Sequence, residues 1–441
     1  MASLPEALAI AQWHYQQGRW NAAVEICQQI LAQQADQPGA LELLGQIRTQ
    51  YAELEQAIAQ WQQHLGKGKD AEVLNQMGLI RRQQEQVDRA IACYQQAIHL
   101  QPGFAEAHCN LANVLRSQGR LEEAIRHYQA AIAADATATE ARNNLGNVLK
   151  HLGRWQEAVA QYQAAIEHQP SFPDAHNNLG VVLHEQGEFE AAIDCYQQAL
   201  HLNPTYPDAH VNLGLLKLLL GDLSTGFREY EWRWQRRDIA PHTFAQPRWD
   251  GSELQGKAIL IHAEQGFGDT IQFLRYVPLL VQRGGRVLVE CDQRMQRLLA
   301  PVQGIEQLVL KHEPLPLFDC HTSLLSLPHQ FETTLDTIPP PIALTPPPLK
   351  AGLPGIAARL KVGLAWAGNP INPIDARRSI PLNELQPLLS LSEVGFYSLQ
   401  TGDRAADLVP FLSASVYDLS PFLQDFAETA AAIAALDLII T

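Results

Sequence analysis

The segment Ile259–Leu280 places a carboxylate where acid–base chemistry is feasible. An apolar run ends at Ala263, Gly266 and Gly268 follow, and Asp269 stands where a helix is expected to begin. Amides of a glycine turn and of a helix N-terminus can hold an anion, and a carboxylate at a strand tip can accept a proton. The alternative is structural, because acidic residues favour the first turn of any helix. Gly-x-Gly-Asp also lacks the third glycine of the dinucleotide fingerprint.

Neighbouring polar and cationic side chains determine what such a site can bind. Gln265 borders the same loop, as does His262, which we expect to be a packed strand residue rather than a second base. Further on, Val362–Leu385 contains Arg378 with Arg377 beside it. A guanidinium on this loop can bind phosphate oxygens bidentately. The alternative is a pair of solvated arginines.

Asparagine recurs at one position of the first half of the chain, directly before a leucine: Asn110, Asn144, Asn178 and Asn212. A second column lies one helical turn further on, at Asn113 and Asn147. A side-chain amide is both donor and acceptor, so a ladder of amides can bind the backbone of an extended polypeptide whatever its sequence. The alternative is that asparagine merely suits this position as a polar, solvated residue.

The composition argues against several other kinds of site. A net charge of −15 argues against a nucleic-acid partner, because phosphate backbones select clustered Lys and Arg. The six cysteines form no Cys-x-x-Cys pair, so we expect buried thiols. We assign no metal, since three histidines are spaced like a solvated loop set: His312, His321 and His329. Without a signal peptide or an apolar stretch of roughly 18 residues, we expect a cytoplasmic protein with no membrane span.

The asparagines belong to a unit of 34 residues that must position them. The same step separates leucines, tyrosines and turn glycines: Leu111, Leu145, Leu179 and Leu213; Tyr94, Tyr128, Tyr162 and Tyr196; Gly119, Gly153, Gly187 and Gly221. Small residues at a further position are expected to let two helices approach closely: Gly78, Ala112, Gly146, Gly180 and Gly214. Each unit is therefore predicted to be a helix-turn-helix.

Five aligned units resemble the tetratricopeptide-repeat (TPR) family, beginning near Ala71, Ala105, Thr139, Pro173 and Pro207. Two weaker copies, one around Gly18 and one around Gly45, extend the expected α-solenoid to about seven repeats over residues 4–238. The asparagine-rich segment Asn143–Ile166 is similar to the TPR half of protein O-linked N-acetylglucosamine transferases. That resemblance implies a groove that binds a polypeptide.

The second half changes to short apolar runs separated by helical stretches: residues 258–263, 286–291, 362–368, 394–400 and 436–441. This alternation predicts parallel sheets covered by helices, as in Rossmann-like α/β domains. We expect a linker over 239–256, a first domain over 257–337, a Pro-rich hinge over 338–355 and a second domain over 356–441. A cleft is expected where the strand ends of the two domains meet.

The loop with Gly268, Asp269 and Pro278 resembles bacterial heptosyltransferase-like glycosyltransferases of the GT-B fold. The resemblance implies that Asp269 is the base that deprotonates an acceptor hydroxyl. It also implies that Arg378 neutralises the diphosphate of a nucleotide-sugar donor. Weaker candidates for nucleotide contacts are Asn369, Ser398 and Gln400, and Asp425 either faces the cleft or caps a helix. No Asp-x-Asp pair occurs, so an inverting, metal-independent transfer without a cofactor is expected.

Two hypotheses about function follow. The first is a TPR-containing glycosyltransferase that transfers a sugar from a nucleotide-diphosphate donor to an acceptor hydroxyl, with a protein Ser or Thr as one candidate acceptor. Because the chain stops at Thr441, where a ligand loop normally follows a strand, we expect its donor half to be incomplete and this form to be inactive. The alternative is a non-enzymatic TPR adaptor for protein–protein interaction with a degenerate transferase-like tail.

Overall fold

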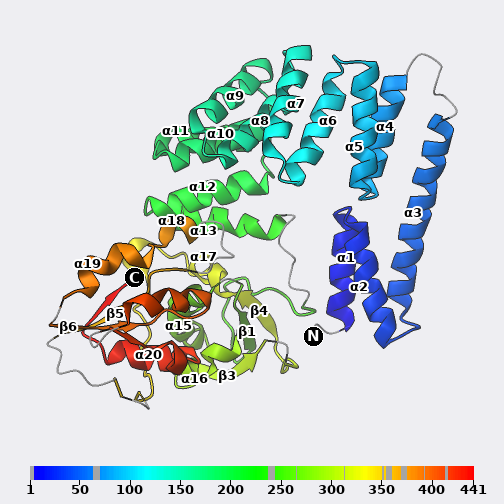
Figure 1. Cartoon of the computed structure of the whole chain (residues 1–441). Helices are drawn as coiled ribbons and strands as arrows, with labels where there is room; N and C mark the ends of the chain where they lie inside the picture. The colour runs from blue at the N-terminus through cyan, green and yellow to red at the C-terminus, as the bar shows by residue number, and fades with distance from the viewer. Residues whose placement is uncertain are drawn as a thin grey trace. The chain divides into compact units, whose positions relative to one another are not determined.

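A computed structural model describes residues 4–62, 70–236, 244–264, 266–311, 313–349, 352–353, 360–368, 375–391, 393–412 and 416–441. The chain separates into two compact units. A helical unit comprises Met1–Thr243 with Glu332–Thr337, and an α/β unit comprises Phe244–Phe331 with Ile338–Thr441. Their internal architectures differ completely, since one is built from helices alone and the other from two parallel sheets with short helices (Figure 1).

The helical unit consists of consecutive helices that pack against their neighbours in the chain (Figure 1). Its helices are α1 (Leu4–Gln16), α2 (Trp20–Gln33), α3 (Pro38–Gln62), α4 (Asp70–Gln83), α5 (Val87–Leu100), α6 (Ala105–Ser117), α7 (Leu121–Ala134), α8 (Thr139–His151), α9 (Trp155–His168), α10 (Pro173–Glu185), α11 (Phe189–Leu202), α12 (Pro207–Leu219) and α13 (Leu223–Tyr230), followed by the 3₁₀ helix η1 (Glu231–Gln235). From α4 to α13 they form the five helix pairs that the 34-residue period predicts.

In three of these pairs, a tyrosine ring from the second helix packs against a glycine of the first. The Tyr162 side chain is fully buried. Its ring is so close to Gly146 that a Cβ atom on this glycine would lie only 2.5 Å from the nearest ring carbon. The same arrangement joins Tyr94 to Gly78 and Tyr196 to Gly180. The predicted close approach of the two helices is therefore confirmed, because the missing Cβ atom of each glycine leaves the space that the aromatic ring fills.

The turn between paired helices requires a left-handed backbone. Four glycines supply it with φ between 73° and 85°: Gly119, Gly153, Gly187 and Gly221. At the equivalent position of the preceding pair, Glu85 adopts φ 58°, which costs a non-glycine residue energy. One repeat earlier this position holds Tyr51, and α3 runs through it without a turn. The unit expected around Gly45 is thus one long helix, because no residue there favours the turn.

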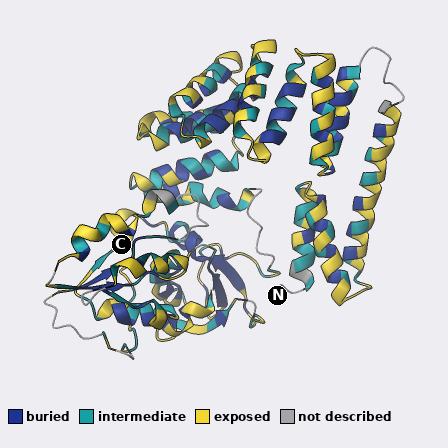
Figure 2. Ribbon diagram, in the orientation of Figure 1, coloured by how far each residue is buried: buried dark blue, intermediate teal, exposed yellow. Residues whose placement is uncertain are grey.

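The first sheet of the α/β unit has four parallel strands in the order β3-β2-β1-β4. They are β1 (Ala258–His262), β2 (Arg286–Cys291), β3 (Ile305–Leu310) and β4 (Cys320–Ser323). The central strand β1 is buried along its whole length (Figure 2), as expected for a sheet covered on both faces. The strand order reverses beside β1, with β2 on one side and β4 on the other.

The second sheet repeats this topology in the order β7-β6-β5-β8, again with all strands parallel. Its strands are β5 (Leu360–Leu364), β6 (Val394–Ser398), β7 (Val416–Asp418) and β8 (Leu438–Ile440). The apolar runs predict five of the eight strands. They miss β3, β4 and β7, which are short or alternate exposed and buried side chains.

Short helices connect these strands. They are α14 (Phe267–Phe273), α15 (Val277–Gln282), α16 (Gln296–Leu299), α17 (Leu327–Gln330), α18 (Asp375–Arg378), α19 (Gln386–Leu389) and α20 (Phe426–Ala434), together with the 3₁₀ helices η2 (Leu274–Tyr276), η3 (Gln293–Met295), η4 (Leu324–Ser326), η5 (Leu335–Thr337), η6 (Leu382–Leu385), η7 (Asp403–Phe411) and η8 (Ser420–Phe422). The unit boundary places η5 with the helical unit.

The hydrophobic core of the first sheet recruits residues from outside the expected first domain. Trp249 and Leu254, expected in a linker, are 4% and 1% exposed in this core. Ala427 of α20 belongs to the same core, and Arg297 of α16 forms ion pairs with Asp425 and Glu428 at 2.8 and 3.1 Å. The helix α20 therefore packs against the first sheet although it lies far along the chain, next to β8.

Candidate functional site

The predicted asparagine ladder forms hydrogen bonds from one repeat to the next. The side-chain Nδ2 of Asn178 donates to Oδ1 of Asn143 at 2.9 Å, and that of Asn212 donates to Asn177 at 3.0 Å. Asn110 donates in the same way to Asn75 at 3.0 Å. The ladder asparagines are half-buried. They are therefore not simply solvated, because each bond ties one helix pair to the preceding pair.

The acceptors of these bonds form a buried asparagine column that the sequence analysis did not identify. Asn75, Asn143 and Asn177 are 0%, 6% and 4% exposed. Their spacing by multiples of 34 residues was the available signal, but Cys109 and Val211 interrupt it. A buried amide must be hydrogen-bonded, which explains why each faces an asparagine of the next repeat.

The second predicted column connects the ladder to the packing tyrosines. Asn113 Oδ1 accepts hydrogen bonds from the Tyr128 hydroxyl at 2.6 Å and from Asn144 Nδ2 at 3.1 Å, replacing the acceptor that Cys109 cannot provide. Asn147 Oδ1 accepts from the Tyr162 hydroxyl at 2.8 Å. Both second-column asparagines thus have a structural role within the repeats.

The ladder keeps unused hydrogen-bonding capacity. An asparagine amide offers two donor hydrogens and a carbonyl oxygen with two lone pairs. In the part of the chain that the structure describes, Asn144, Asn178 and Asn212 each use one donor hydrogen, and no hydrogen bond occupies their carbonyl oxygens. These half-buried side chains are held in position by one bond and retain an acceptor and a donor for another molecule.

In the α/β unit, Asp269 caps the helix in which it lies. Asp269 is the third residue of α14, and its Oδ2 accepts a hydrogen bond from the backbone N–H of Gly266 at 3.2 Å. Asp269 thus has the structural role that acidic residues commonly have in the first turn of a helix, and this hydrogen bond occupies one of its carboxylate oxygens. Gly268 is exposed on the same helix, and Gln265 lies outside the described residues.

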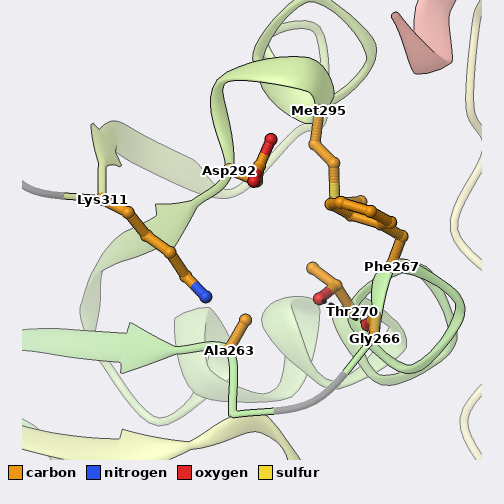
Figure 3. A pocket seen from close by; sticks show the side chains of 7 residues that line it. All are labelled: Ala263, Gly266, Phe267, Thr270, Asp292, Met295 and Lys311. Atoms are coloured by element: carbon orange, nitrogen blue, oxygen red, sulfur yellow. Dashed lines mark hydrogen bonds between the residues drawn. The ribbon is translucent and has the colours of Figure 1, made fainter. Parts of the chain in front are cut away.

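A small cavity opens beside this helix at the carboxyl ends of β1, β2 and β3. Its volume is about 140 Å³, and its lining is Ala263, Gly266, Phe267, Thr270, Asp292, Met295 and Lys311. Figure 3 shows the Lys311 ammonium and the Asp292 carboxylate directed toward it from one side, with Phe267 and Met295 on the other. Asp269 is not among the lining residues. Sequence analysis missed Asp292 and Lys311, which follow β2 and β3 directly.

The carboxylate in this cavity is held in its charged form. Arg294 donates to both oxygens of Asp292, at 2.9 and 3.1 Å, and these bonds lower the pKa of Asp292 to about 2. The guanidinium of Arg294 also lies over the ring of Phe267 at 4.5 Å. Asp292 therefore remains ionised at neutral pH and is unsuited to donate a proton.

The residues predicted to bind a nucleotide in the second sheet have different environments. Gln400 is buried and clamps the loop after β5: its Oε1 accepts from the backbone N–H groups of Trp366 and Ala367 at 3.1 and 3.0 Å. Ser398 is also buried, and its hydroxyl accepts from the backbone N–H of Gln400 at 3.3 Å. These interactions position the loop and leave little of either side chain accessible.

The predicted phosphate clamp lies at the end of α18. Arg378 is exposed there, near Gly368 of the loop after β5. Asn369 and the side chain of Arg377 lie outside the described part of the chain. Asp425 caps α20 by accepting from the backbone N–H of Glu428 at 2.9 Å, which is the capping alternative for this residue.

Metal and membrane sites are not found in the described residues. No group of three or more His, Cys, Asp or Glu side chains there could hold a metal ion. Among the described helices, none combines the length and the apolar character that crossing a membrane requires. His321 does not lie in a solvated loop as expected, because it is buried on β4. The expectation that His262 is a packed strand residue is confirmed, since it is buried on β1 with its ring nitrogen 3.3 Å from that of His321.

Comparison with known proteins identifies the helical unit. Residues 75–139 and 143–207 match one tetratricopeptide-repeat profile, and residues 195–226 match another. Protein FlbA of Caulobacter vibrioides is 27% identical over 257 residues, which are 51% of this chain and 43% of FlbA. The chain thus spans less than half the length of this curated relative.

Solved structures with a similar arrangement include MamA and YrrB. The crystal structure of MamA is 24% identical and covers 36% of this chain and 93% of MamA, with a TM-score of 0.33. That of YrrB, described as a TPR protein with an unusual peptide-binding site, is 20% identical and covers 40% of this chain and 91% of YrrB, with a TM-score of 0.34. The profile matches and the observed helix pairs agree that the helical unit is a tetratricopeptide-repeat solenoid.

Proposed function

We propose that this protein is an interaction scaffold whose TPR solenoid binds an extended polypeptide along the asparagine ladder. TPR solenoids present extended surfaces to polypeptide partners. The observation that carries the proposal is the unused acceptor and donor on each ladder asparagine. Because these amides recur once per repeat, they can contact carbonyl and N–H groups at regular intervals along an extended chain.

The inter-repeat bonds support binding because they orient the amides before the partner arrives. A free asparagine side chain loses rotamer freedom when it binds, and a bond already formed removes part of that cost. Asn178 is fixed by Asn143 at 2.9 Å, and Asn144 is fixed by Asn113 at 3.1 Å. The ladder is thus pre-organised for main-chain contacts.

A matched pair of variants separates binding from structure. Asn178→Ala removes both the inter-repeat bond and the groove amide, whereas Asn143→Ala removes only the buried acceptor of that bond. We expect the double variant Asn144→Ala/Asn178→Ala to weaken binding of an extended Ser/Gln peptide about tenfold or more, since each lost hydrogen bond contributes roughly 0.5–1.5 kcal/mol.

Fluorescence anisotropy measures the affinity, and circular dichroism monitors helix content. Asn143→Ala should lower the melting temperature but keep most of the affinity. Equal loss of affinity in Asn143→Ala and Asn178→Ala would mean that the amides act only through solenoid stability. Unchanged affinity in the double variant would refute the ladder as the binding site.

A glycosyltransferase activity is the second candidate, and one observation favours it. Both sheets have all-parallel strands in the same order, with a reversal beside the first strand of each. Ligands of open α/β sheets bind at the carboxyl ends of the strands beside such a reversal. In this proposal, Asp269 is the base and Arg378 binds the donor diphosphate, without a metal ion.

Calorimetric titration with uridine, guanosine and adenosine diphosphate sugars tests this candidate directly. Specific binding that Arg378→Gln weakens would support it. If transfer is then found, Asp269→Asn should lower turnover by about 10²–10⁴ while donor affinity stays unchanged. Absence of binding for every donor would leave the scaffold function alone.

A further inference from the structure

A row of basic side chains runs along the same helices as the asparagine ladder. These residues are separated by 34 positions and lie in the last turns of α4, α6 and α8: Arg82, Arg116 and Lys150. We call them the cation row, and His184 of α10 stands at the next position of the same step. In a chain with a net charge of −15, three such side chains at one repeat position form a local exception.

The cation row adjoins the second asparagine column. Arg116 and Lys150 stand three residues after Asn113 and Asn147, and residues three apart in a helix are neighbours on one face. Arg116 also interacts with the hydroxyl of Tyr128, which donates to Asn113 at 2.6 Å. A peptide on the ladder would therefore lie within reach of these cations.

Within the part of the chain that the structure describes, Arg82, Arg116 and Lys150 form no ion pair, unlike other arginines of the solenoid. Arg120 pairs with Glu123 and Arg154 pairs with Glu157, both at 2.7 Å. Lys150 forms no ion pair among the described residues, although its side chain is half-buried; burial lowers its pKa, against a smaller opposing effect of Glu185. The helix dipole favours a cation at a helix C-terminus. This effect also acts on a fully hydrated side chain, so it does not explain why Lys150 is half-buried.

An acidic row at the opposite ends of these helices is, by contrast, largely engaged within the protein. Glu106 accepts from Asn75 at 2.9 Å, and Asp174 accepts from the Tyr206 hydroxyl at 2.9 Å. Asp208 pairs with Arg236 at 3.4 Å. Glu140, at the same repeat position, is exposed.

We propose that the polypeptide bound by this solenoid is acidic, with Asp or Glu side chains that meet the cation row while its backbone contacts the asparagine ladder. This inference rests on the proposed scaffold function and specifies the class of partner. Successive residues of an extended chain point to opposite sides, so carboxylates at alternate positions can all face the row. The negative charge of the rest of the protein would repel an acidic chain elsewhere.

Three extended peptides of about 20 residues test the inference: alternating Ser and Glu, the same peptide with Gln for Glu, and the same with Lys for Glu. With the full chain, we expect the Glu peptide to bind about tenfold or more tightly than the Gln peptide at low salt. The difference should shrink as salt is raised, because half-exposed ion pairs are screened.

Variants locate the effect. Lys150→Gln and Arg116→Gln should each weaken the Glu peptide about three- to tenfold and leave the Gln peptide unchanged. Lys150→Arg should retain most of the preference. Arg126→Gln, which removes an exposed arginine of α7 outside the row, is the matched control and should have no effect.

The outcomes distinguish this inference from the scaffold function. Equal affinity for the Glu and Gln peptides, or preference for the Lys peptide, would overturn the cation row and leave the ladder standing. A preference for Glu that Arg126→Gln abolishes as strongly as Lys150→Gln would also overturn it. If none of the peptides binds, both the scaffold function and the acidic partner are refuted.

Discussion

The helical unit and the α/β unit show two ways in which a sequence specifies structure. In the helical unit, the contact between Gly146 and Tyr162 recurs between Gly180 and Tyr196, 34 residues later. In the α/β unit, Trp249 and Ala427 reach one core from positions far apart in the chain. Repeated local contacts are visible as a period, whereas single long-range contacts leave no pattern.

The largest effect is expected where the α/β unit depends on such a long-range contact. Trp249→Ala should destabilise the α/β unit by about 3–5 kcal/mol, because it empties a site that is 4% exposed in the core. Hydrogen exchange followed by mass spectrometry should show loss of protection in β1 and β2 but not in α6 to α11. Normal protection in β1 would mean that this residue belongs to a linker after all.

Adding one methyl group tests the repeated contact of the helical unit. Gly146→Ala should cost about 1–3 kcal/mol, since its Cβ atom would lie 2.5 Å from the ring of Tyr162. Gly45→Ala is the control: this glycine is inside α3 with open space around it, so alanine should stabilise by up to about 1 kcal/mol. Thermal unfolding by circular dichroism compares the two. Similar shifts in both would contradict the packing argument.

A missing hydrogen bond offers a stabilising change. Among the described residues, the buried hydroxyls of Tyr94 and Tyr196 have no hydrogen-bond partner, because Leu79 and Val181 replace the asparagine that serves Tyr162. Val181→Asn should restore the acceptor and raise stability by about 0.5–1.5 kcal/mol. The midpoint of urea unfolding measures the gain. A decrease would show that the apolar contacts of Val181 outweigh the bond.

The smallest predicted effect depends on pH. His127 Nδ1 lies 3.0 Å from Nδ1 of His108, whose Nε2 donates to the carbonyl of Pro102 at 3.0 Å, so His108 Nδ1 is the acceptor. Burial and the neighbouring histidine lower the pKa of His127 below its ordinary 6.5, against a smaller opposing effect of Glu123. Below about pH 6.5, the unfolded chain therefore binds more protons at His127 than the folded protein does. The free energy of unfolding accordingly falls on acidification.

The measurement compares urea unfolding midpoints at about pH 7.5 and 5.5. The wild type should lose more stability between these values than His127→Gln does. His151→Gln, another histidine of the solenoid, serves as the control. A steeper pH dependence in His127→Gln than in the wild type would reverse the sign of this interpretation.

The sequence alone predicted only part of the candidate site, and the reason why the rest was not predicted differs between the two units. The ladder positions follow from the 34-residue step, but the role of Asn143 as acceptor requires knowing which helices are adjacent. The step also predicted a repeat around Gly45, and this prediction is wrong. Tyr51 stands at the turn position and disfavours the left-handed backbone, so α3 continues as one helix. In the α/β unit, Asp269 was singled out correctly as a helix-start residue, yet the cavity formed by Asp292 and Lys311 was not foreseen.

The sequence by itself determined the repeat length, the helix pairs from α4 to α13, the close approach of glycine and tyrosine, and the parallel α/β character of the second half. These follow from local periodicity, since each repeat contacts mainly its neighbours. Only the tertiary structure decided which amides bond across repeats, which cations form no ion pair among the described residues, and which side chains converge at the carboxyl ends of the strands. Those properties depend on distances between residues remote in the chain, which periodicity does not encode.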